Sequence, residues 1–249
     1  MATVIVANDL VGVGKVALTS SLPIMSACQT EVLPLPTVLL SSHTGEFENI
    51  YMRDLTDDLK GFYKQWEHLD FTVDGLVSGY FKSREELKIV GQLARDKRIA
   101  LFVDPIMGDN GRLYQGFDME YVEAMKDFCQ QADAIIPNLT EASLLTDSPY
   151  LEVGSYDKAT VDKLLRDLTK LGPRKVVLTG ISFEEGKIGL AYFDKETNKT
   201  TYLMRKSYKS HFYGSGDLVT AVLASGYFHH LNLLKVANLA LDFMDQVLS

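Results

Sequence analysis

The sequence predicts an α/β fold, in which a mostly parallel central sheet lies between two layers of helices as a three-layer α/β/α sandwich. Two observations support this class. Short apolar or β-branched runs bounded by Gly, Pro, Asp or Asn recur along the chain, which is typical of strands buried on both faces of a parallel sheet. Segments with helical spacing separate these runs, and strands that alternate with helices form right-handed crossovers.

The predicted strands are brief. They lie at residues 3–7, 75–79, 99–104, 134–138 and 175–180. Two further stretches break the alternation. Residues 31–45 contain two prolines within an apolar run, which predicts an edge strand that continues into a loop. Residues 187–210 predict a β-hairpin with its turn near residues 194–199.

Three amphipathic segments predict helices between the strands. Residues 83–97 begin with Ser83 and have Glu86 three residues later, which is a capping-box pattern. Residues 118–131 and 160–172 have helical spacing, and Gly172 ends the second of them. Because we find no repeat, linker or low-complexity tract, we expect one domain over residues 1–249.

Composition narrows the class of protein. The 249 residues are 46% hydrophobic and 23% charged, which is ordinary for a globular protein. A net charge of −8 argues against a nucleic-acid or anionic-membrane partner. The two cysteines match no metal or redox spacing, and the first apolar run lacks a basic segment and is too short for a signal peptide. We therefore expect a cytoplasmic protein.

The segment VIVANDLVGVGKVALTS has the order of a strand, a phosphate loop and a helix. The phosphate loop of nucleoside triphosphatases requires G-x-x-x-x-G-K-[ST]. Gly14 and Lys15 supply the Gly-Lys pair, but Asp9 replaces the first glycine and Val16 replaces the hydroxyl residue. We reject this motif, although the segment can still line a pocket beyond the end of a strand.

Polar clusters follow the predicted strands at what should be one edge of the sheet. They are Asn8 with Asp9, Asp104, Asn138 with Glu141, and Asp217. Each cluster alone has a structural alternative, since an Asp before Pro is often a turn residue and Asn-x-x-Glu has the capping-box form. Their joint position at strand ends favours a functional site.

Phosphoryl transfer explains these residue types, because it needs an anion cradle, an acid that holds a metal and a base. The Gly-Ser-Gly turn at residues 214–216 would present backbone N–H groups at a helix N-terminus. Larger side chains at either glycine would hinder the turn and block close approach. Asp217 could accept a proton from a hydroxyl. Glu141 and Asp104 offer oxygen ligands for Mg²⁺.

The chain resembles the ribokinase-like superfamily of small-molecule kinases, and within it the pyridoxal/pyridoxamine kinases. The strings that carry the resemblance are VDPIMGDNGRLY, PNLTEASLLT, PLPTVLLSSHTG, SGYFKS and GSGDLV. They occur along nearly the whole chain in the family's order. The DPxMGDNGxLY string is specific for vitamin B6 kinases, whereas GxGD and NxxE are shared by the superfamily.

The resemblance implies roles for the residues near the reacting groups. Asp217 corresponds to the catalytic base that activates the 5′-hydroxyl of a B6 vitamer. Gly214, Ser215 and Gly216 correspond to the anion hole that faces the transferred phosphoryl group. ATP and Mg²⁺ are implied as cosubstrate and metal, and a monovalent cation such as K⁺ is left open.

The resemblance also assigns the two ligands of the reaction. On the nucleotide side, Asn138 and Glu141 form the pair that orients Mg²⁺ and its waters, and Asp104 lies near the phosphates. Thr179 and residues 205–213 border the nucleotide. On the vitamer side, the residues that line the pyridine pocket are Asn8, Thr44 and Tyr80.

Several alternatives stay open at this point. The chain could phosphorylate hydroxymethylpyrimidine instead of a B6 vitamer, or bind a vitamer without catalysis. His43 could hydrogen-bond near the substrate or be a structural loop histidine. Relatives are typically homodimers, and an exposed edge strand near Pro34 would suit such an interface.

Overall fold

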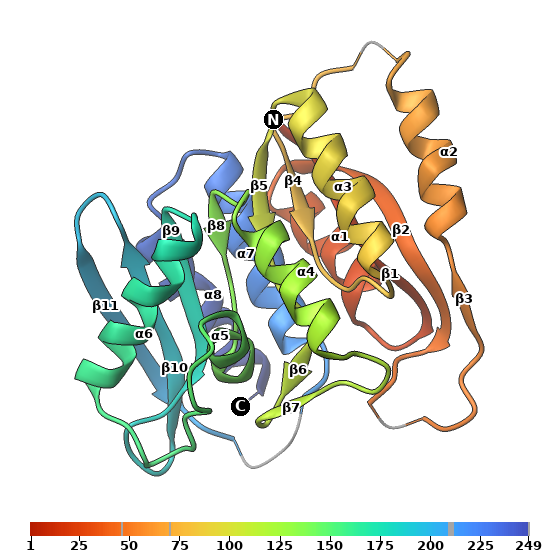
Figure 1. Cartoon of the computed structure of the whole chain (residues 1–249). Coiled ribbons are helices and arrows are strands. Elements are labelled where there is room, and N and C mark those ends of the chain that lie inside the picture. Colours follow the sequence, from red (N-terminus) through yellow and green to blue (C-terminus); the bar gives the residue numbers. More distant parts are fainter. Residues whose placement is uncertain (46, 70, 209–211, 249) are drawn as a thin grey trace. The chain divides into compact units, whose positions relative to one another are not determined.

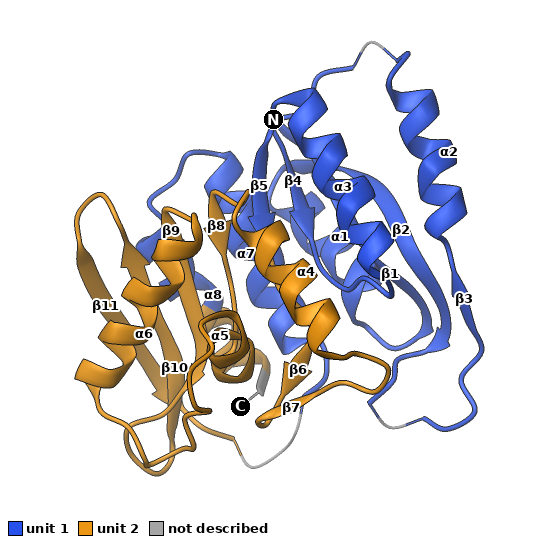
Figure 2. Ribbon diagram, in the orientation of Figure 1, with its two compact units in different colours: residues 1–102, 212–240 blue, residues 103–211, 241–249 orange. Residues whose placement is uncertain are grey.

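The computed structural model describes residues 1–45, 47–69, 71–208 and 212–248 (Figure 1). The chain forms two compact units (Figure 2), each of which is described by itself. Unit 1 comprises residues 1–102 and 212–240, and unit 2 comprises residues 103–211 and 241–249. The expectation of a single domain over residues 1–249 stays a prediction.

Unit 1 contains the N-terminal strands and helices together with a late helix. Its elements are β1 (Ala2–Val13), α1 (Ala17–Ala27), β2 (Thr30–Ser42), β3 (Met52–Asp54), α2 (Thr56–Trp66), β4 (Gly75–Ser78), α3 (Arg84–Lys97), β5 (Ala100–Val103), whose last residue belongs to unit 2, and α7 (Ser215–Phe228). The final helix, α8 (Leu233–Leu248), has residues in both units.

The strands of unit 1 lie in the order β5-β4-β1-β2-β3, and β1 is parallel to both β2 and β4. From β1, the chain reaches β2 through α1, whereas from β4 it moves in the opposite direction to β5 through α3. Right-handed crossovers of opposite direction place α1 and α3 on opposite faces of the sheet. Helix α7 packs against α1, and α2 packs against α3. Unit 1 is therefore layered as expected.

Strand β1 is longer than the sequence predicts. It continues past Asn8 and Asp9 to Val13, so these two polar residues lie inside the strand and not beyond its end. The pairing with β2 is irregular between Asn8 and Leu10. An irregularity of this kind re-aims neighbouring side chains and is frequent beside active sites.

The predicted edge strand is confirmed for only part of its length. Strand β2 pairs with β1 from Thr30 onward, and its residues Val38 to Leu40 also pair with β3. That second half is therefore an interior segment, and the short β3 is the edge. Both prolines, Pro34 and Pro36, precede the stretch that pairs with β3, where their missing N–H groups are not required.

Unit 2 contains the predicted hairpin and a second group of helices. Its elements are β6 (Gly108–Asp109), β7 (Arg112–Leu113), α4 (Met119–Cys129), β8 (Ala134–Ile135), α5 (Leu139–Leu145), α6 (Lys158–Leu171), β9 (Lys175–Ile181), β10 (Lys187–Asp194) and β11 (Lys199–Lys206). The strand order is β11-β10-β9-β8. Strands β8 and β9 are parallel, while β10 and β11 form the antiparallel hairpin, closed by the pair Asp194 and Lys199.

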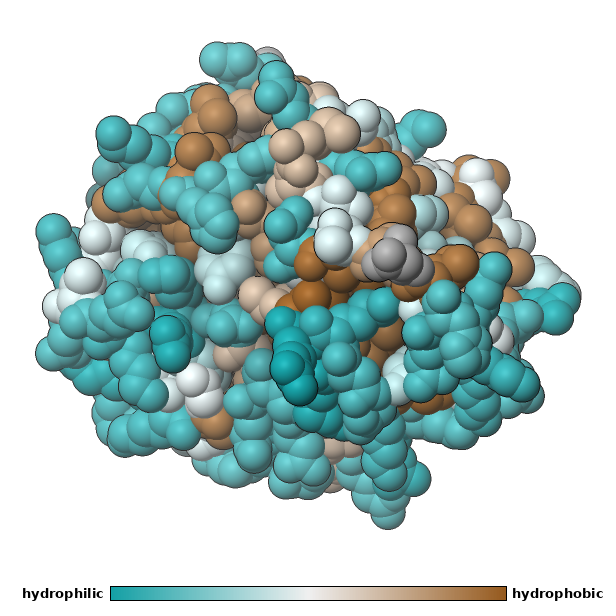
Figure 3. All heavy atoms as spheres, turned by 90° about the horizontal axis from the view of Figure 1, so that it is seen from above, coloured by the Kyte–Doolittle hydropathy of each residue, from teal (hydrophilic) through white to brown (hydrophobic). Residues whose placement is uncertain are grey.

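Burial follows the sequence pattern in both units. In β1, Val4, Ile5 and Val6 are buried, as are Val176 and Val177 in β9, so these strands are covered on both faces. The face seen in Figure 3 is mostly hydrophilic, with hydrophobic residues in separate patches. None of the described helices is both long and apolar enough to cross a membrane. The α/β class with mostly parallel strands between helices is confirmed.

Candidate active site

The glycine turn before α7 has the form expected of an anion cradle. Gly214 has a φ of +82°, a left-handed conformation that favours glycine, and a Cβ there would overlap the carbonyl oxygen of Lys15. The Ser215 hydroxyl donates to the Phe212 carbonyl 3.1 Å away, which closes the turn. No side chain of the described residues caps the helix. Its first N–H groups therefore lack intrahelical acceptors, and with the helix dipole behind them they could bind an anion.

Gly216 differs from Gly214, and the expectation that both glycines are needed for the turn is wrong for Gly216. It lies within the first turn of α7, where its φ is not left-handed, and a Cβ would meet no atom within 4 Å. The turn itself therefore tolerates a side chain at this position. That glycine permits the close approach of a phosphoryl group at this position stays a prediction.

Asp217 occupies the first turn of α7 and is half-buried. Burial raises the pKa of its carboxyl above the ordinary value of 3.8, while hydrogen bonds from the backbone N–H of Ala17 and from the Asn8 amide oppose that rise. Ala17 has a φ of +49°, which is unusual for a residue with a side chain. The strained backbone of Ala17 thus helps to hold the carboxylate in one orientation.

Asn8 connects the residues around Asp217. Its Oδ1 accepts the backbone N–H of Asp9 at 3.0 Å and that of Tyr80 at 2.8 Å, and its amide reaches the Asp217 carboxylate. Gly79 lies directly against the Asn8 side chain, where a Cβ would overlap it. The irregularity in β1 thus brings Asn8, Asp9, Tyr80 and Asp217 together within unit 1.

Asp9 is a second carboxyl group beside Asp217. Its side chain is buried, and burial followed by repulsion from Asp217 raises its pKa from 3.8 to about 7. Burial, then the charges of Asp9 and Glu86, raise the pKa of Tyr80 to about 12. The two aspartates differ in their donors: the Ala17 N–H and the Asn8 amide support the charged form of Asp217, whereas only its own backbone N–H supports that of Asp9.

We expect Asp9→Asn to raise the free energy of unfolding above pH 7 and to leave it unchanged below pH 4. A buried carboxyl whose pKa rises on folding binds its proton more tightly in the folded state, so its contribution falls as pH increases from about 4 to about 7. Asparagine removes that loss, which is at most about 4 kcal/mol. Urea unfolding at pH 4.0 and pH 8.0 measures the difference.

The control is Asp58→Asn, an exposed position on α2. Equal stabilities of wild type and Asp9→Asn at pH 8.0 would contradict the buried, proton-bearing state of Asp9. The groups that face Asp9 are Asp217 of α7 and Tyr80 after β4.

Two buried residues that the sequence analysis did not assign to the site hold the segment after β4. Thr37, within β2, donates its hydroxyl to the Tyr80 carbonyl at 2.7 Å. Glu86 accepts the backbone N–H of Lys82 at 2.6 Å and completes the predicted capping box with Ser83. A polar residue between buried strand positions was the available signal for Thr37, and the capping-box pattern was the signal for Glu86.

Thr44 lies in the turn that follows β2, and its side chain is exposed. Its neighbours in the same turn, His43 and Gly45, contact Tyr213 just before the glycine turn. Unit 1 therefore brings together the predicted residues Asn8, Thr44, Tyr80 and Asp217 with the turn at residues 214–216.

The remaining predicted residues form a second group in unit 2. Asn138 caps α5, and it exchanges hydrogen bonds with Glu141 in a complete capping box, at 3.0 Å and 2.8 Å. The Asn138 amide also donates to the Gly108 carbonyl, and the Met107 N–H donates to Glu141 at 3.3 Å. The structural alternative for this pair is thus realised, and it also fixes both side chains in place.

Glu141 is buried, and its surroundings are acidic. Burial, followed by repulsion from Asp104, raises its pKa well above 4.5, against the two backbone N–H groups it accepts. Thr179 bridges to Asn138 and bonds the Pro137 carbonyl through its N–H. Unit 2 therefore brings together Asp104, Asn138, Glu141 and Thr179. Of the predicted nucleotide segment at residues 205–213, residues 209–211 lie outside the described residues.

Comparisons with known proteins identify a small-molecule kinase of the α/β class and the family to which it belongs. A family model described as phosphomethylpyrimidine kinase matches residues 56–249. Pyridoxal kinase of Dictyostelium discoideum is 28% identical over 212 residues, which cover 78% of this chain and 67% of the relative. The chain spans between 62% and 67% of the length of the first curated relatives it matches.

Two solved structures share the fold over nearly the whole chain. Pyridoxal kinase from Lactobacillus plantarum has a TM-score of 0.91 and 33% identity, covering 99% of this chain and 87% of its own. A candidate phosphomethylpyrimidine kinase from Bacteroides thetaiotaomicron, crystallised with pyridoxal, has a TM-score of 0.93 and 32% identity, covering 98% and 86%. The chain belongs to the phosphomethylpyrimidine kinase family. The resemblance to pyridoxal kinases of the ribokinase-like fold is confirmed.

Proposed function

We propose that the protein is an ATP-dependent kinase that phosphorylates the 5′-hydroxyl of pyridoxal, pyridoxine and pyridoxamine. The observation that carries the proposal is the placement of Asp217 in unit 1. Its carboxylate follows the glycine turn directly and is held by the Ala17 N–H and the Asn8 amide. A protein that only bound the vitamer would not need an oriented carboxylate beside free helix N–H groups.

In the proposed mechanism, the residues of unit 1 act on the alcohol. Asn8, Thr44 and Tyr80 hold the pyridine ring. Asp217 takes the proton of the 5′-hydroxyl while the hydroxyl oxygen attacks the γ-phosphorus of ATP. The N–H groups of the turn at residues 214–216 stabilise the negative charge on the phosphoryl oxygens. ADP and the vitamer 5′-phosphate are the products.

In unit 2, Asp104 and Glu141 are the residues that would hold Mg²⁺, beside Asn138 and Thr179 on the nucleotide side. A divalent cation fits this donor set. The carboxyl groups of Asp104 and Glu141 repel each other, and a cation between them would attract both. No group of three or more metal-ligating side chains occurs among the residues described. Water and phosphate oxygens would therefore supply most ligands, as is usual for Mg²⁺, which neutralises phosphate charge when bound.

Hydroxymethylpyrimidine is the second candidate acceptor, because the matching family model is described as phosphomethylpyrimidine kinase. It carries the same kind of primary alcohol on a flat aromatic ring, so the base and the glycine turn would serve it equally. The two acceptors differ in the ring atoms that Asn8 and Tyr80 would face.

The test is ADP formation with each acceptor offered separately: pyridoxal, pyridoxine, pyridoxamine and hydroxymethylpyrimidine. We expect ADP to form with at least one B6 vitamer and at a higher kcat/KM than with the pyrimidine. A clear preference for the pyrimidine would overturn the substrate assignment. Tight binding of pyridoxal without any ADP would instead assign the chain to the vitamer-binding class.

We further propose a cytoplasmic homodimer built from one domain over residues 1–249. The half of β2 that precedes Val38 is free of β3 and supports the edge around Pro34 as the interface. Sedimentation measures the oligomeric state, and activity with and without K⁺ measures dependence on a monovalent cation.

A further inference from the structure

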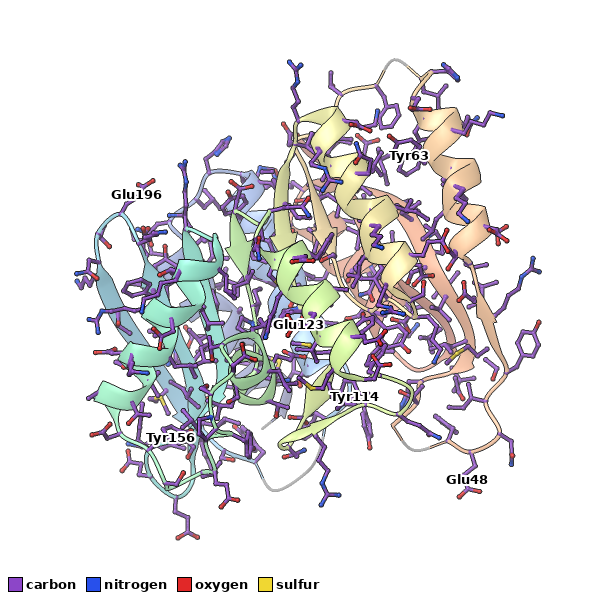
Figure 4. The ribbon with its side chains drawn as sticks, viewed as in Figure 1. Glu48, Tyr63, Tyr114, Glu123, Tyr156 and Glu196 are labelled. Carbon is purple, nitrogen blue, oxygen red and sulfur yellow. The ribbon has the colours of Figure 1, made fainter. Side chains whose placement is uncertain are left out.

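The loop after β2 is fastened to the segment before the glycine turn by an aromatic contact. The rings of His43 and Tyr213 lie 4.7 Å apart with an interplanar angle of 34°, and Phe47 packs edge-on against His43 at 4.9 Å. Glu48 marks the same loop in Figure 4, and its exposed side chain points away from the ribbon. The contact therefore joins parts of unit 1 that are distant in sequence.

Two hydrogen bonds reinforce this contact through Gly45. The Tyr213 hydroxyl donates to the Gly45 carbonyl at 3.0 Å, and the Gly45 N–H donates to Nδ1 of His43 at 3.2 Å. A Cβ at Gly45 would overlap the Tyr213 ring, so glycine permits the close approach. Because Nδ1 accepts a hydrogen bond, the neutral ring of His43 carries its proton on Nε2.

The same loop also touches the segment after β1. Gly14 has a φ of +116°, and a Cβ there would lie 2.7 Å from Cδ2 of His43. The next residue, Lys15, places its carbonyl oxygen against Gly214. His43 thus packs against Gly14, and Gly214 packs against Lys15, the next residue along the chain. Tyr213, which contacts His43 and precedes Gly214, links these two residues directly.

We propose that His43 and Tyr213 are positioning residues that couple the vitamer loop to the phosphoryl cradle. This inference rests on the proposed function. Thr44, between His43 and Gly45, belongs to the vitamer side, and Gly214, which follows Tyr213, begins the cradle. The contacts among His43, Gly45 and Tyr213, which form the clasp, fix the position of Thr44 relative to Gly214. Nδ1 of His43 is engaged by its own loop, as the structural alternative for this residue predicts, whereas a hydrogen bond from Nε2 to the substrate stays a prediction.

The consequence is that loss of the clasp affects the acceptor and the chemistry together. Displacement of the cradle by about 1 Å relative to the alcohol lowers the rate by up to about 10²-fold. Tyr213 ends the segment predicted to border the nucleotide, and the cradle would meet the γ-phosphate, so loss of the clasp should also affect the KM for ATP. We expect Tyr213→Ala to raise the vitamer KM and lower kcat, each by about tenfold or more, and to raise the KM for ATP by a smaller factor.

Tyr213→Phe is the conservative variant, because it keeps the ring contact and removes only the hydroxyl. We expect its kinetic effects to be smaller than those of Tyr213→Ala. Tyr51→Ala is the matched control, since Tyr51 lies in the same unit with its side chain 68% exposed. Vitamer KM and kcat within twofold of wild type in Tyr213→Ala, or a rise in the KM for ATP larger than the rise in the vitamer KM, would overturn the proposal.

A second measurement separates failure of the clasp from failure of the proposed function. Hydrogen exchange at the amides of Gly45 and Leu218, which donate to Nδ1 of His43 and to the Gly214 carbonyl, does not require catalysis. We expect exchange there to be faster by about tenfold or more in Tyr213→Ala than in wild type and unchanged in Tyr51→Ala. If wild type formed no ADP with any acceptor, faster exchange would still support the clasp, and unchanged exchange would refute it.

Discussion

Replacing Asp217 by asparagine is expected to lower kcat by a factor of 10²–10⁴ without unfolding the protein. That range is the usual contribution of a positioned general base. Asparagine keeps an oxygen that can accept the Ala17 N–H, so the hydrogen bond that now orients the carboxylate is preserved. It also removes a charge whose formation burial disfavours, so the free energy of unfolding should not decrease.

The measurement is kcat for the best vitamer, together with urea unfolding of both proteins. Asp217→Glu adds a second comparison, because it keeps the charge and moves it by one methylene. Asp9→Asn tests the neighbouring carboxyl group, for which we expect a smaller loss of kcat, since Asp9 accepts neither the Ala17 N–H nor the Asn8 amide that orient Asp217. Full activity of Asp217→Asn would refute the role of base. A larger loss in Asp9→Asn would move that role to Asp9.

Much of this arrangement could be predicted because its signals are local. The Gly-Ser-Gly-Asp string predicts a tight turn followed by a helix, and α7 begins at Ser215. The capping boxes of Ser83 with Glu86 and of Asn138 with Glu141 depend on spacing alone, and both are complete. Such features are visible in a sequence because the groups that make them are three residues apart.

Features that depend on distant partners could not be predicted in the same way. Residues 9–13 contain an aspartate and a glycine, and only pairing with β2 extends β1 through them. The three residues of β3 and the two-residue strands β6 and β7 exist through pairing as well. In Figure 4, Tyr114 marks the segment just after β7, where the sequence indicates a family motif but no strand.

The site, too, has features that local signals predict and features that depend on distant partners. Asp9 was recognisable as a polar residue near a strand end, but its contact with Asp217 joins positions more than two hundred residues apart. The backbone N–H of Ala17 reaches Asp217 from a left-handed conformation that nothing in the sequence indicates. Backbone donors carry no residue-type signal, so a site built partly from them is only partly visible before the chain is folded.

The two glycines of the cradle provide the sharpest separation of structure from function. We expect Gly216→Ala to leave stability unchanged or to raise it by up to about 1 kcal/mol, because alanine is the better helix residue and its Cβ would meet no atom within 4 Å. The methyl group would occupy the space of the incoming phosphoryl group, so kcat should fall on the order of 10²-fold, the cost of losing one such donor.

Gly214→Ala is the matched comparison, and we expect its main effect on stability and not on kcat. A left-handed φ and overlap with the Lys15 carbonyl would destabilise the fold by about 2 kcal/mol or more. Thermal unfolding and kcat of both variants decide the matter. If Gly216→Ala kept wild-type kcat, the first turn of α7 would not face the transferred phosphoryl group. The glycine at position 216 would then have no role in catalysis, and the cradle would have to lie elsewhere on unit 1.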